Sequence, residues 1–244
     1  MDDLDLFAQM LDEARRVVLF TGAGISTESG IPDFRSPGGI WSRFKPVEFQ
    51  DFVASEDARR DAWRFKMLSD PDMRRAEPNR GHRAVAELVH RGKVSCVITQ
   101  NIDGLHKKAG SLGVTEIHGS LREIDCLSCG KAYLAPHVPE GDPPYCECGG
   151  VLKPNTVLFG EQLPREALET AYRESSTCKT MLVIGTSAVV QPAASLPSLA
   201  KQNGAVVIEV NPEKAFGAAN YYIAEKAGTA LTRIVEEVRG LTSG

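Results

Sequence analysis

The sequence predicts an α/β fold, with a doubly wound, mainly parallel sheet and a smaller split domain. Short apolar runs that are typical of buried strands alternate with segments of helical spacing, as in βαβ units. A Gly22-Ala23-Gly24 turn follows the first apolar run, at the place where such sheets bind nucleotides. Two segments, 31–79 and 119–152, interrupt the alternation. The smaller domain would be built from these two segments.

The expected elements follow in order along the chain. Helical spacing over Leu4–Ala14 leads into a strand at Arg16–Phe20. Helices are expected at Asp57–Leu68 and at Arg80–Arg91, where Gly92 is the stop signal. The remaining elements are strands at Lys93–Thr99, Lys179–Ile184 and Ala205–Val210, and helices at Pro164–Ser175 and through Leu231–Val238.

Length and composition limit the possible classes of protein. The chain has 244 residues, of which 42% are hydrophobic, so it can bury a core as one large domain with an insertion or as two domains. The net charge of −4 gives no electrostatic sign of nucleic-acid binding. No apolar run reaches the length of a membrane span, and the acidic start is unlike a signal peptide. We expect a soluble, cytoplasmic protein.

The glycine turn matches only part of the dinucleotide-binding fingerprint. Gly22 and Gly24 allow backbone N–H groups to approach a phosphate, but Thr27 stands where the third glycine of G-x-G-x-x-G belongs. The following segment, 29–35, is rich in turn formers and carries Phe34 and Arg35. A hydride-transfer enzyme needs no such second loop. The pattern favours an enzyme that cleaves the dinucleotide.

Polar residues follow four of the predicted strands. They lie in the segments 21–24, 99–103, 185–187 and 209–213. Because ligands in open α/β sheets bind at the carboxyl ends of strands, we expect these segments to form one cleft. Gln100, Asn101 and Asp103 could recognise a carboxamide such as nicotinamide, although Asp103 could equally cap the next helix.

Four cysteines predict a metal site. Cys126-x-x-Cys129 is followed by Cys146-x-Cys148, and glycines adjoin both pairs. This pattern fits a tetrahedral Cys₄ zinc site, and four thiolates leave no open position, so the zinc would be structural. Disulfides and inert buried thiols are the alternatives, and no export signal supports disulfides. Two other cysteines, Cys96 and Cys178, are expected to have no part in the site.

His118 is the candidate general base among five histidines. It follows a short apolar segment, 114–117, at a junction between the two predicted domains, and Gly119 beside it would let a ligand approach. Its ordinary pKa near 6.5 suits proton abstraction at neutral pH. A packed histidine satisfied by backbone is the alternative at this position. The other four histidines, His82, His90, His106 and His137, are expected to be structural.

These signals together resemble the sirtuins, the NAD-dependent protein deacylases, over nearly the whole chain. The matching segments are GAGISTESGIPDFR (22–35), TQNIDGLH (99–106), HGS (118–120), CLSC with CEC, KPNTVLFGE (153–161), GTS (185–187) and EVNPE (209–213). The resemblance implies a Rossmann-like NAD-binding domain (1–30, 80–118 and 153–244) with a smaller domain. That smaller domain would have a helical part (31–79) and a zinc ribbon (119–152).

The resemblance also implies a set of site residues. Catalysis would rest on His118 and Asn101, and one structural Zn²⁺ would be held by Cys126, Cys129, Cys146 and Cys148. NAD would be bound by Gly22, Ala23, Gly24, Ser26, Thr27, Asp33, Phe34, Arg35, Trp41, Gln100, Asn101, Ile102, Asp103, Gly185, Thr186, Ser187, Asn211, Glu213 and Ala227. The acyl-lysine substrate would lie against Val157, Phe159, Gly160, Glu161 and Val189.

The implied reaction converts acyl-lysine and NAD to lysine, nicotinamide and O-acyl-ADP-ribose. The acyl oxygen would attack the sugar carbon as nicotinamide leaves, and His118 would then activate a ribose hydroxyl. The partners would be acyl-lysine proteins or peptides, bound by a monomer that contacts neither nucleic acid nor membrane. Asn155 stands where the family usually has aspartate. Lys66 and Ser69 stand where relatives that prefer succinyl groups have tyrosine and arginine, so we expect neutral acyl groups, acetyl first.

Three other functions share parts of this pattern. A protein mono-ADP-ribosyltransferase would use the same NAD cleavage with a protein nucleophile. A nonenzymatic NAD sensor would need no general base, so the combination of Asn101, Asp103 and His118 argues against it. A dehydrogenase is disfavoured by the missing third glycine and by the extra loop.

Overall fold

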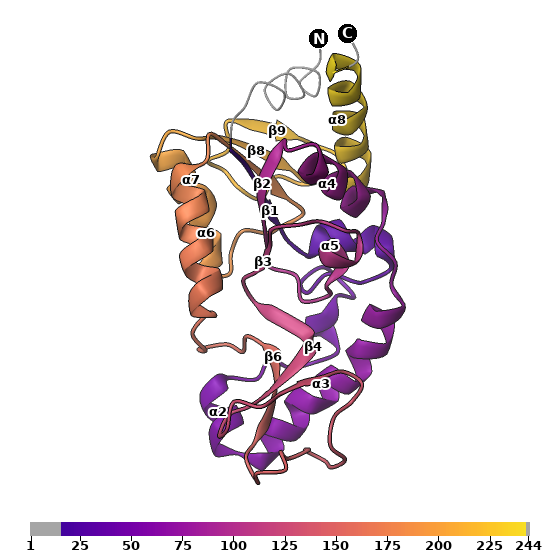
Figure 1. Ribbon diagram of the computed structural model, residues 1–244, viewed down its shortest axis with the longest axis vertical. Helices are drawn as coiled ribbons and strands as arrows, with labels where there is room; N and C mark the ends of the chain where they lie inside the picture. Colours follow the sequence, from indigo (N-terminus) through magenta and orange to yellow (C-terminus); the bar gives the residue numbers. More distant parts are fainter. Residues whose placement is uncertain (1–15, 243–244) are drawn as a thin grey trace.

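A six-stranded parallel sheet forms the centre of the upper half of the computed structural model, which describes residues 16–242 (Figure 1). The helix expected over Leu4–Ala14 lies outside these residues. The strand order is β3-β2-β1-β7-β8-β9, and every neighbouring pair is parallel. The strands are β1 (Val17–Thr21), β2 (Val94–Thr99), β3 (Val114–Glu116), β7 (Thr180–Ile184), β8 (Val206–Val210) and β9 (Tyr221–Ile223). The four strands predicted from apolar runs are confirmed to within one residue at each end.

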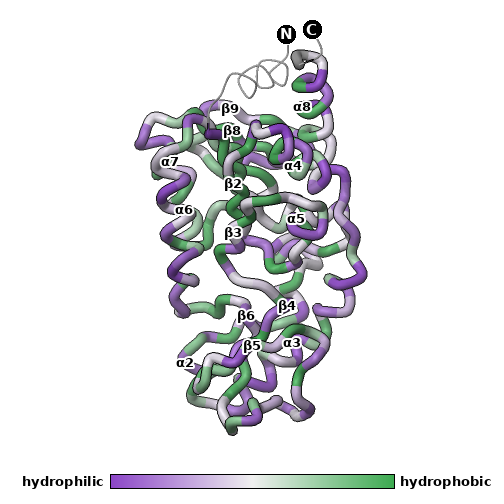
Figure 2. The backbone as a smooth tube through the Cα atoms, viewed as in Figure 1, coloured by the Kyte–Doolittle hydropathy of each residue, from purple (hydrophilic) through white to green (hydrophobic). Residues whose placement is uncertain are grey.

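Helices cover both faces of this sheet, as the doubly wound prediction requires. Alternate residues of β1 point to opposite faces: Val17 and Leu19 pack in one core cluster, and Val18 and Phe20 in another. The first cluster is closed by α4 (Arg80–His90) and α8 (Ala227–Thr242), and the second by α6 (Arg165–Thr177) and α7 (Leu196–Gln202). Figure 2 shows hydrophobic residues along the central strands and hydrophilic residues along the outer helices.

The two segments that interrupt the alternation pack against each other in the lower half of Figure 1. The first contains α2 (Phe49–Ala54) and α3 (Glu56–Arg75), and the second contributes an antiparallel sheet of order β5-β4-β6. Its strands are β4 (Gly119–Cys126), β5 (Ala132–Leu134) and β6 (Leu152–Thr156). Trp63 of α3 donates its indole N–H to the Leu152 carbonyl at 3.0 Å and packs on the cysteine cluster. Strand β6 spans the position, 152/153, where the predicted ribbon part ends and the large domain resumes. The predicted division of the chain into domains stays a prediction.

Helix α3 is longer than expected. The predicted end at Leu68 is wrong, since the helix continues through Pro71 to Arg75. Asp70 pairs with Lys66 at 3.0 Å and with Arg74 at 3.1 Å, both at the i,i+4 spacing that supports a helix. The side chain of Ser55 caps the first turn by accepting from Ala58 N.

Short helical turns connect the larger elements at the sheet edge. They are η1 (Ala23–Ser29), η2 (Ile40–Ser42), η3 (Ala193–Ser195) and α5 (Leu105–Lys108). The turn η1 ends at Gly30, whose φ of 82° favours glycine. Thr27, at the position of the missing third glycine, donates its hydroxyl to the Gly24 carbonyl at 2.9 Å. The threonine that replaces the third glycine of the fingerprint therefore closes this turn with its own side-chain hydrogen bond.

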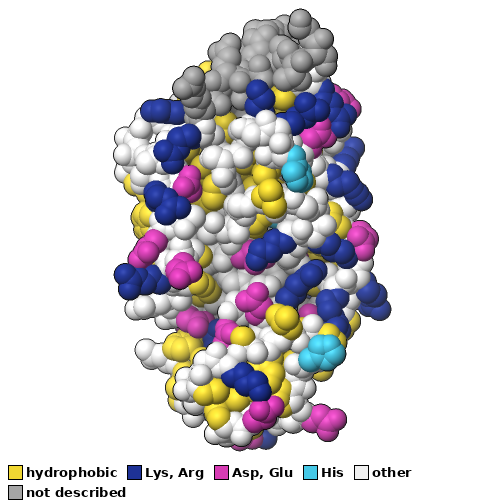
Figure 3. Space-filling model, viewed as in Figure 1, with side chains coloured by type: hydrophobic (Ala, Val, Ile, Leu, Met, Phe, Trp, Pro, Cys, Tyr) yellow, Lys and Arg dark blue, Asp and Glu magenta, His cyan; other side chains and the backbone are white. Residues whose placement is uncertain are grey.

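The surface carries charges of both signs. On the face shown in Figure 3, basic and acidic side chains are interspersed over the helices. Among residues 16–242, no helix is both long enough and apolar enough to span a bilayer.

Candidate functional site

A cleft of about 600 Å³ lies at the carboxyl ends of β1, β2, β7 and β8. The four polar segments expected to converge there do so. The residues predicted to bind NAD or substrate that line it are Gly22, Ala23, Gly24, Thr27, Asp33, Phe34, Arg35, Trp41, Gln100, Asn101, Ile102, His118, Val157, Phe159, Gly160, Glu161, Gly185, Thr186, Ser187, Asn211, Glu213 and Ala227. Val189 is outside the lining and is 59% exposed, whereas Val190 beside it lines the cleft.

Two glycines allow the walls of the cleft to approach each other. A Cβ added at Gly24 would lie 2.7 Å from the Gly185 Cα, and one added at Gly185 would lie 2.6 Å from the Ile25 nitrogen. Gly24 donates its N–H to the Gly185 carbonyl at 2.8 Å. The close backbone approach leaves a concave surface of the kind that accepts a dinucleotide phosphate.

Side-chain amides join the ends of neighbouring strands. Gln100, after β2, donates to the Thr186 hydroxyl after β7 at 2.8 Å. Asn211, after β8, donates to the Thr186 carbonyl at 2.9 Å and to Glu209 at 3.0 Å. Glu209 is fully buried and also accepts from the backbone of Ala215 and Phe216. These bonds fix the polar edge of the sheet.

A small side pocket next to the cleft contains Asn101 and Asp103 of the predicted carboxamide-recognition group, whereas Gln100 lines only the cleft. The side pocket shares Ala23, Phe34, Asn101 and Ile102 with the cleft, and Ser26 and Asp103 line only this pocket. Ser26 donates to the Asp103 carboxylate at 2.7 Å, and Asn101 donates to Ser26 at 3.2 Å. Burial raises the pKa of Asp103, against the opposing effect of its hydrogen bonds. Asp103 also accepts from Leu105 N, the first residue of α5, at 2.8 Å, although Gly104 is the N-cap residue of that helix.

Two histidines expected to be structural lie beneath this pocket. His82 and His106 are buried with their ring centroids 5.0 Å apart. His82 Nε2 is 3.4 Å from the Ser26 hydroxyl, and His106 Nε2 is 3.0 Å from that of Thr21. Burial lowers the pKa of His82 to about 4 and that of His106 to about 3, so both rings are neutral at pH 7.

His118 lines the cleft with one ring nitrogen fixed. Its Nδ1 is 3.1 Å from the Gln100 carbonyl oxygen, which can only accept, so Nδ1 carries the proton. Nε2 is then the unprotonated nitrogen. Burial lowers the pKa of His118 below 6.5, although the bond to Gln100 acts in the opposite direction. At neutral pH the ring is therefore a neutral base held in one tautomer.

Aromatic side chains form one wall of the cleft. The ring of Trp41 lies 5.1 Å from that of Phe34, 6.0 Å from Phe159 and 6.2 Å from Phe65, centroid to centroid. These distances are those of favourable aromatic pairs. The residues come from the 31–79 segment and from the loop after β6. This wall presents apolar surface to one side of the cleft.

Several lining residues were missed by sequence reasoning. Ala62 and Phe65 of α3 line the cleft, as do Lys45, Pro46 and Val47 before α2. Ala62 and Phe65 have the i,i+3 spacing of one helix face, which was the available signal.

Lys66 and Ser69, the positions compared with the succinyl-preferring relatives, are not among the lining residues. The Lys66 side chain is 3% exposed and pairs with Asp70.

The four cysteines predicted to bind metal come together. Their sulfur atoms all lie within 4.8 Å of one another; Cys126 and Cys148 are 3.6 Å apart, and Cys129 and Cys146 are 3.7 Å apart. Four sulfurs at about 2.3 Å from a tetrahedral zinc ion are separated by about 3.8 Å, so the arrangement fits zinc. Cys96 and Cys178 are buried in the core beside the large sheet, as expected.

Comparison with known proteins gives concordant matches. The model of the Sir2 family matches residues 22–192. The NAD-dependent protein deacylase 2 of Pyrobaculum aerophilum is 46% identical over 238 residues, covering 95% of this chain and 94% of the relative. A Sir2 homolog–NAD complex superposes with a TM-score of 0.88 at 40% identity, covering 99% of this chain and 95% of that chain. A Sir2–p53 peptide–NAD+ structure gives 0.88 at 36% identity, covering 98% of this chain and all of that one.

Proposed function

The chain belongs to the Sir2 family, and on this basis we propose that it is an NAD-dependent protein-lysine deacylase. It converts acyl-lysine, NAD and water to lysine, nicotinamide and O-acyl-ADP-ribose. The observation that carries the proposal is His118, a neutral base of fixed tautomer on the wall of a cleft with a glycine cradle. A sensor that only bound NAD would not need such a base.

We assign the ADP-ribose part of NAD to the glycine side of the cleft. Gly22 and Gly24 would contact the phosphates, Ser187 and Asn211 the riboses, and Glu213 the adenosine ribose. Nicotinamide would enter the side pocket, where the Asn101 amide, Ser26 and Asp103 meet. NAD supplies the sugar carbon that accepts the acyl oxygen.

His118 would take a proton at Nε2. The Gln100 carbonyl holds the proton on Nδ1, so Nε2 presents a lone pair to a ribose hydroxyl. Phe34, together with Trp41, would shield the reacting carbon from water.

The substrate backbone would add as a strand along Val157–Glu161. This segment is held at its start and at its middle, since Val157 N donates to the His118 carbonyl at 3.0 Å and Phe49 N donates to the Phe159 carbonyl at 2.8 Å. Lys153 pairs with Glu161 at 3.0 Å and fixes the turn. Strand addition uses backbone bonds, which gives affinity with little sequence specificity.

Neutral acyl groups, acetyl first, are the proposed substrates. Ala62, Phe65 and Val47 offer apolar surface to the acyl chain. The Lys66 ammonium is committed to Asp70, so a succinyl carboxylate finds no buried cation from α3. Lys45 lines the cleft but is exposed, where an ion pair contributes little.

One structural zinc ion fits the Cys₄ cluster, where it would link the turn after β4 to the turn before β6. We further propose a cytoplasmic, monomeric protein whose partners are acyl-lysine proteins rather than nucleic acid. Four thiols gathered as metal ligands suit a reducing compartment. On the face shown in Figure 3, basic side chains are mixed with acidic ones, and the net charge of the chain is −4.

A panel of acyl-lysine peptides with NAD, analysed by mass spectrometry, tests the proposal. We expect O-acetyl-ADP-ribose and free lysine, with kcat/KM for acetyl-lysine above that for succinyl-lysine. H118A should lose turnover by about 10²–10⁴-fold and still bind NAD. The matched control H137A, which changes an exposed histidine of the ribbon segment, should be fully active. ADP-ribose attached to protein without released O-acyl-ADP-ribose would favour the transferase alternative.

A further inference from the structure

We propose that Glu28 is a positioning residue that sets the affinity for NAD by tying together two walls of the dinucleotide cleft. This inference rests on the proposed function, because it assigns the ADP-ribose part of NAD to those walls. The carboxylate of Glu28 is the link, and the guanidinium of Arg80 holds it in place.

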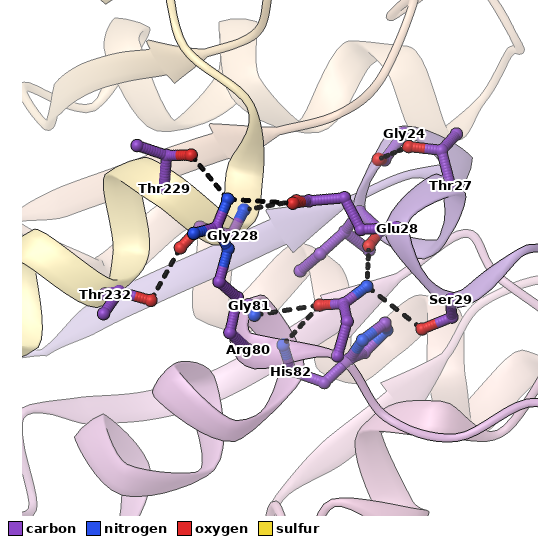
Figure 4. Close-up of polar contacts among 12 residues, drawn as sticks. Gly24, Thr27, Glu28, Ser29, Arg80, Gly81, His82, Gly228, Thr229 and Thr232 are labelled. Atoms are coloured by element: carbon purple, nitrogen blue, oxygen red, sulfur yellow. Dashed lines mark hydrogen bonds and ion pairs between the residues drawn. The ribbon is translucent and has the colours of Figure 1, made fainter.

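Glu28 contacts two other elements at once (Figure 4). Its Oε2 accepts the backbone N–H of Gly228, in the first turn of α8, at 2.9 Å. Its Oε1 pairs with Arg80 Nη2, at the start of α4, at 3.1 Å. The same Nη2 donates to the Thr229 hydroxyl at 2.8 Å. A carboxylate at the first turn of a helix satisfies an otherwise unpaired N–H and interacts favourably with the helix dipole.

The linked residues adjoin the cleft on both sides. Thr27, which precedes Glu28, lines the cleft, and so does Ala227, which precedes Gly228. The Glu28–Gly228 bond therefore fixes the separation of η1 from the start of α8. The side chain of Glu28 is 20% exposed, so this bond is partly shielded from water.

The elements η1, α4 and α8 meet at a junction formed by Glu28, Arg80 and Gly228, and two glycines pack closely there. A Cβ added at Gly228 would lie 2.5 Å from Glu28 Oε2, and one added at Gly81 would lie 3.4 Å from Gly228 Cα. Asn79 completes the junction by donating to the Ile25 carbonyl at 2.7 Å while it caps α4 through Gly81 N at 2.8 Å. Loss of the Glu28 carboxylate removes the bond between η1 and α8, and we expect these walls to separate.

The test compares E28A and E28Q with a control on the same pair of helices. Glu87 of α4 pairs with Arg239 of α8 at 2.7 Å, and neither residue lines the cleft. E87A therefore breaks an α4–α8 ion pair without touching the cleft walls. Binding of ADP-ribose is measured by calorimetry, and KM for NAD, KM for acetyl-lysine peptide and kcat are measured by steady-state kinetics.

We expect E28A to raise Kd for ADP-ribose and KM for NAD by about tenfold, as for loss of one well-placed hydrogen bond. KM for peptide and kcat at saturating NAD should change less than about twofold. E28Q, whose carbonyl still accepts from Gly228, should raise Kd by about threefold. E87A should leave Kd unchanged.

An unchanged Kd in E28Q and E28A, or an equal rise in E87A, overturns the inference. If E28A does not fold, E28Q decides alone, since a rise supports the role and an unchanged Kd refutes it. Failure of the wild type to bind ADP-ribose would instead refute the proposed function.

Discussion

Gly24→Ala should damage the NAD site through a steric conflict that no side-chain movement can relieve. The added methyl carbon would lie 2.7 Å from Gly185 Cα, 2.8 Å from its oxygen and 3.0 Å from its carbonyl carbon. Carbon atoms pack best at about 3.5–4.0 Å, so the overlap approaches 1 Å. Since all three neighbours are backbone atoms, η1 or the loop after β7 must move. Such overpacking costs about 1–3 kcal/mol of unfolding free energy.

The assay is thermal unfolding with and without ADP-ribose. The cost corresponds to a fall in Tm of about 2–12 °C for a chain of this size. Both displaced segments line the cleft, so we also expect a rise of at least about tenfold in Kd for ADP-ribose. Gly217→Ala is the matched control, because its Cβ would meet nothing within 4 Å. Equal Tm and Kd values in the two variants would refute the steric argument.

Three further predictions follow from the site and its support. The kcat/KM for deacetylation should be constant near neutral pH and should fall as the pH drops through the pKa of His118. We expect the midpoint below pH 6.5, because burial disfavours the charged ring, and a midpoint above pH 7 would contradict this. Cys129→Ser should abolish the one-per-chain zinc content and lower the unfolding free energy by several kcal/mol, whereas Cys178→Ser should keep the zinc, as measured by metal analysis and thermal unfolding. Asp70→Asn should lower the free energy of unfolding, measured in urea, by about 3–5 kcal/mol, because it leaves the buried Lys66 ammonium without its charged partner. Lys66→Met should leave the free energy of unfolding nearly unchanged. An altered acyl preference in Lys66→Met would contradict our account of the cleft.

The large sheet could be predicted because its strands are buried on both faces. Strand β1 is buried throughout and is apolar from Val17 to Phe20, and this makes it visible as a continuous run. The cleft followed from the same pattern, since parallel strands bring their carboxyl ends to one edge. The zinc site could be predicted because four cysteines at short spacings have few other uses in such a chain.

Features that depend on contacts between distant segments could not be read from the sequence. The pairing of His82 with His106 joins α4 to α5, and neither residue carries a local sign of it. Glu209 looks like a surface carboxylate, yet it is fully buried and organises the loop after β8. In each case burial, rather than residue type, determines the role.

The zinc-ribbon segment leaves and rejoins the large domain at one point. Gly119 pairs with Thr156 in the β4–β6 ladder, and beside them Val157 N bonds to the His118 carbonyl. The ends of the excursion are therefore already closed, and residues inserted near its tip add mainly loop-closure entropy, about 0.6 kcal/mol for each doubling of length. His118 and the segment proposed to bind the substrate backbone, Val157–Glu161, lie outside this closed loop. The ribbon can thus change length and surface in evolution while the catalytic geometry is conserved.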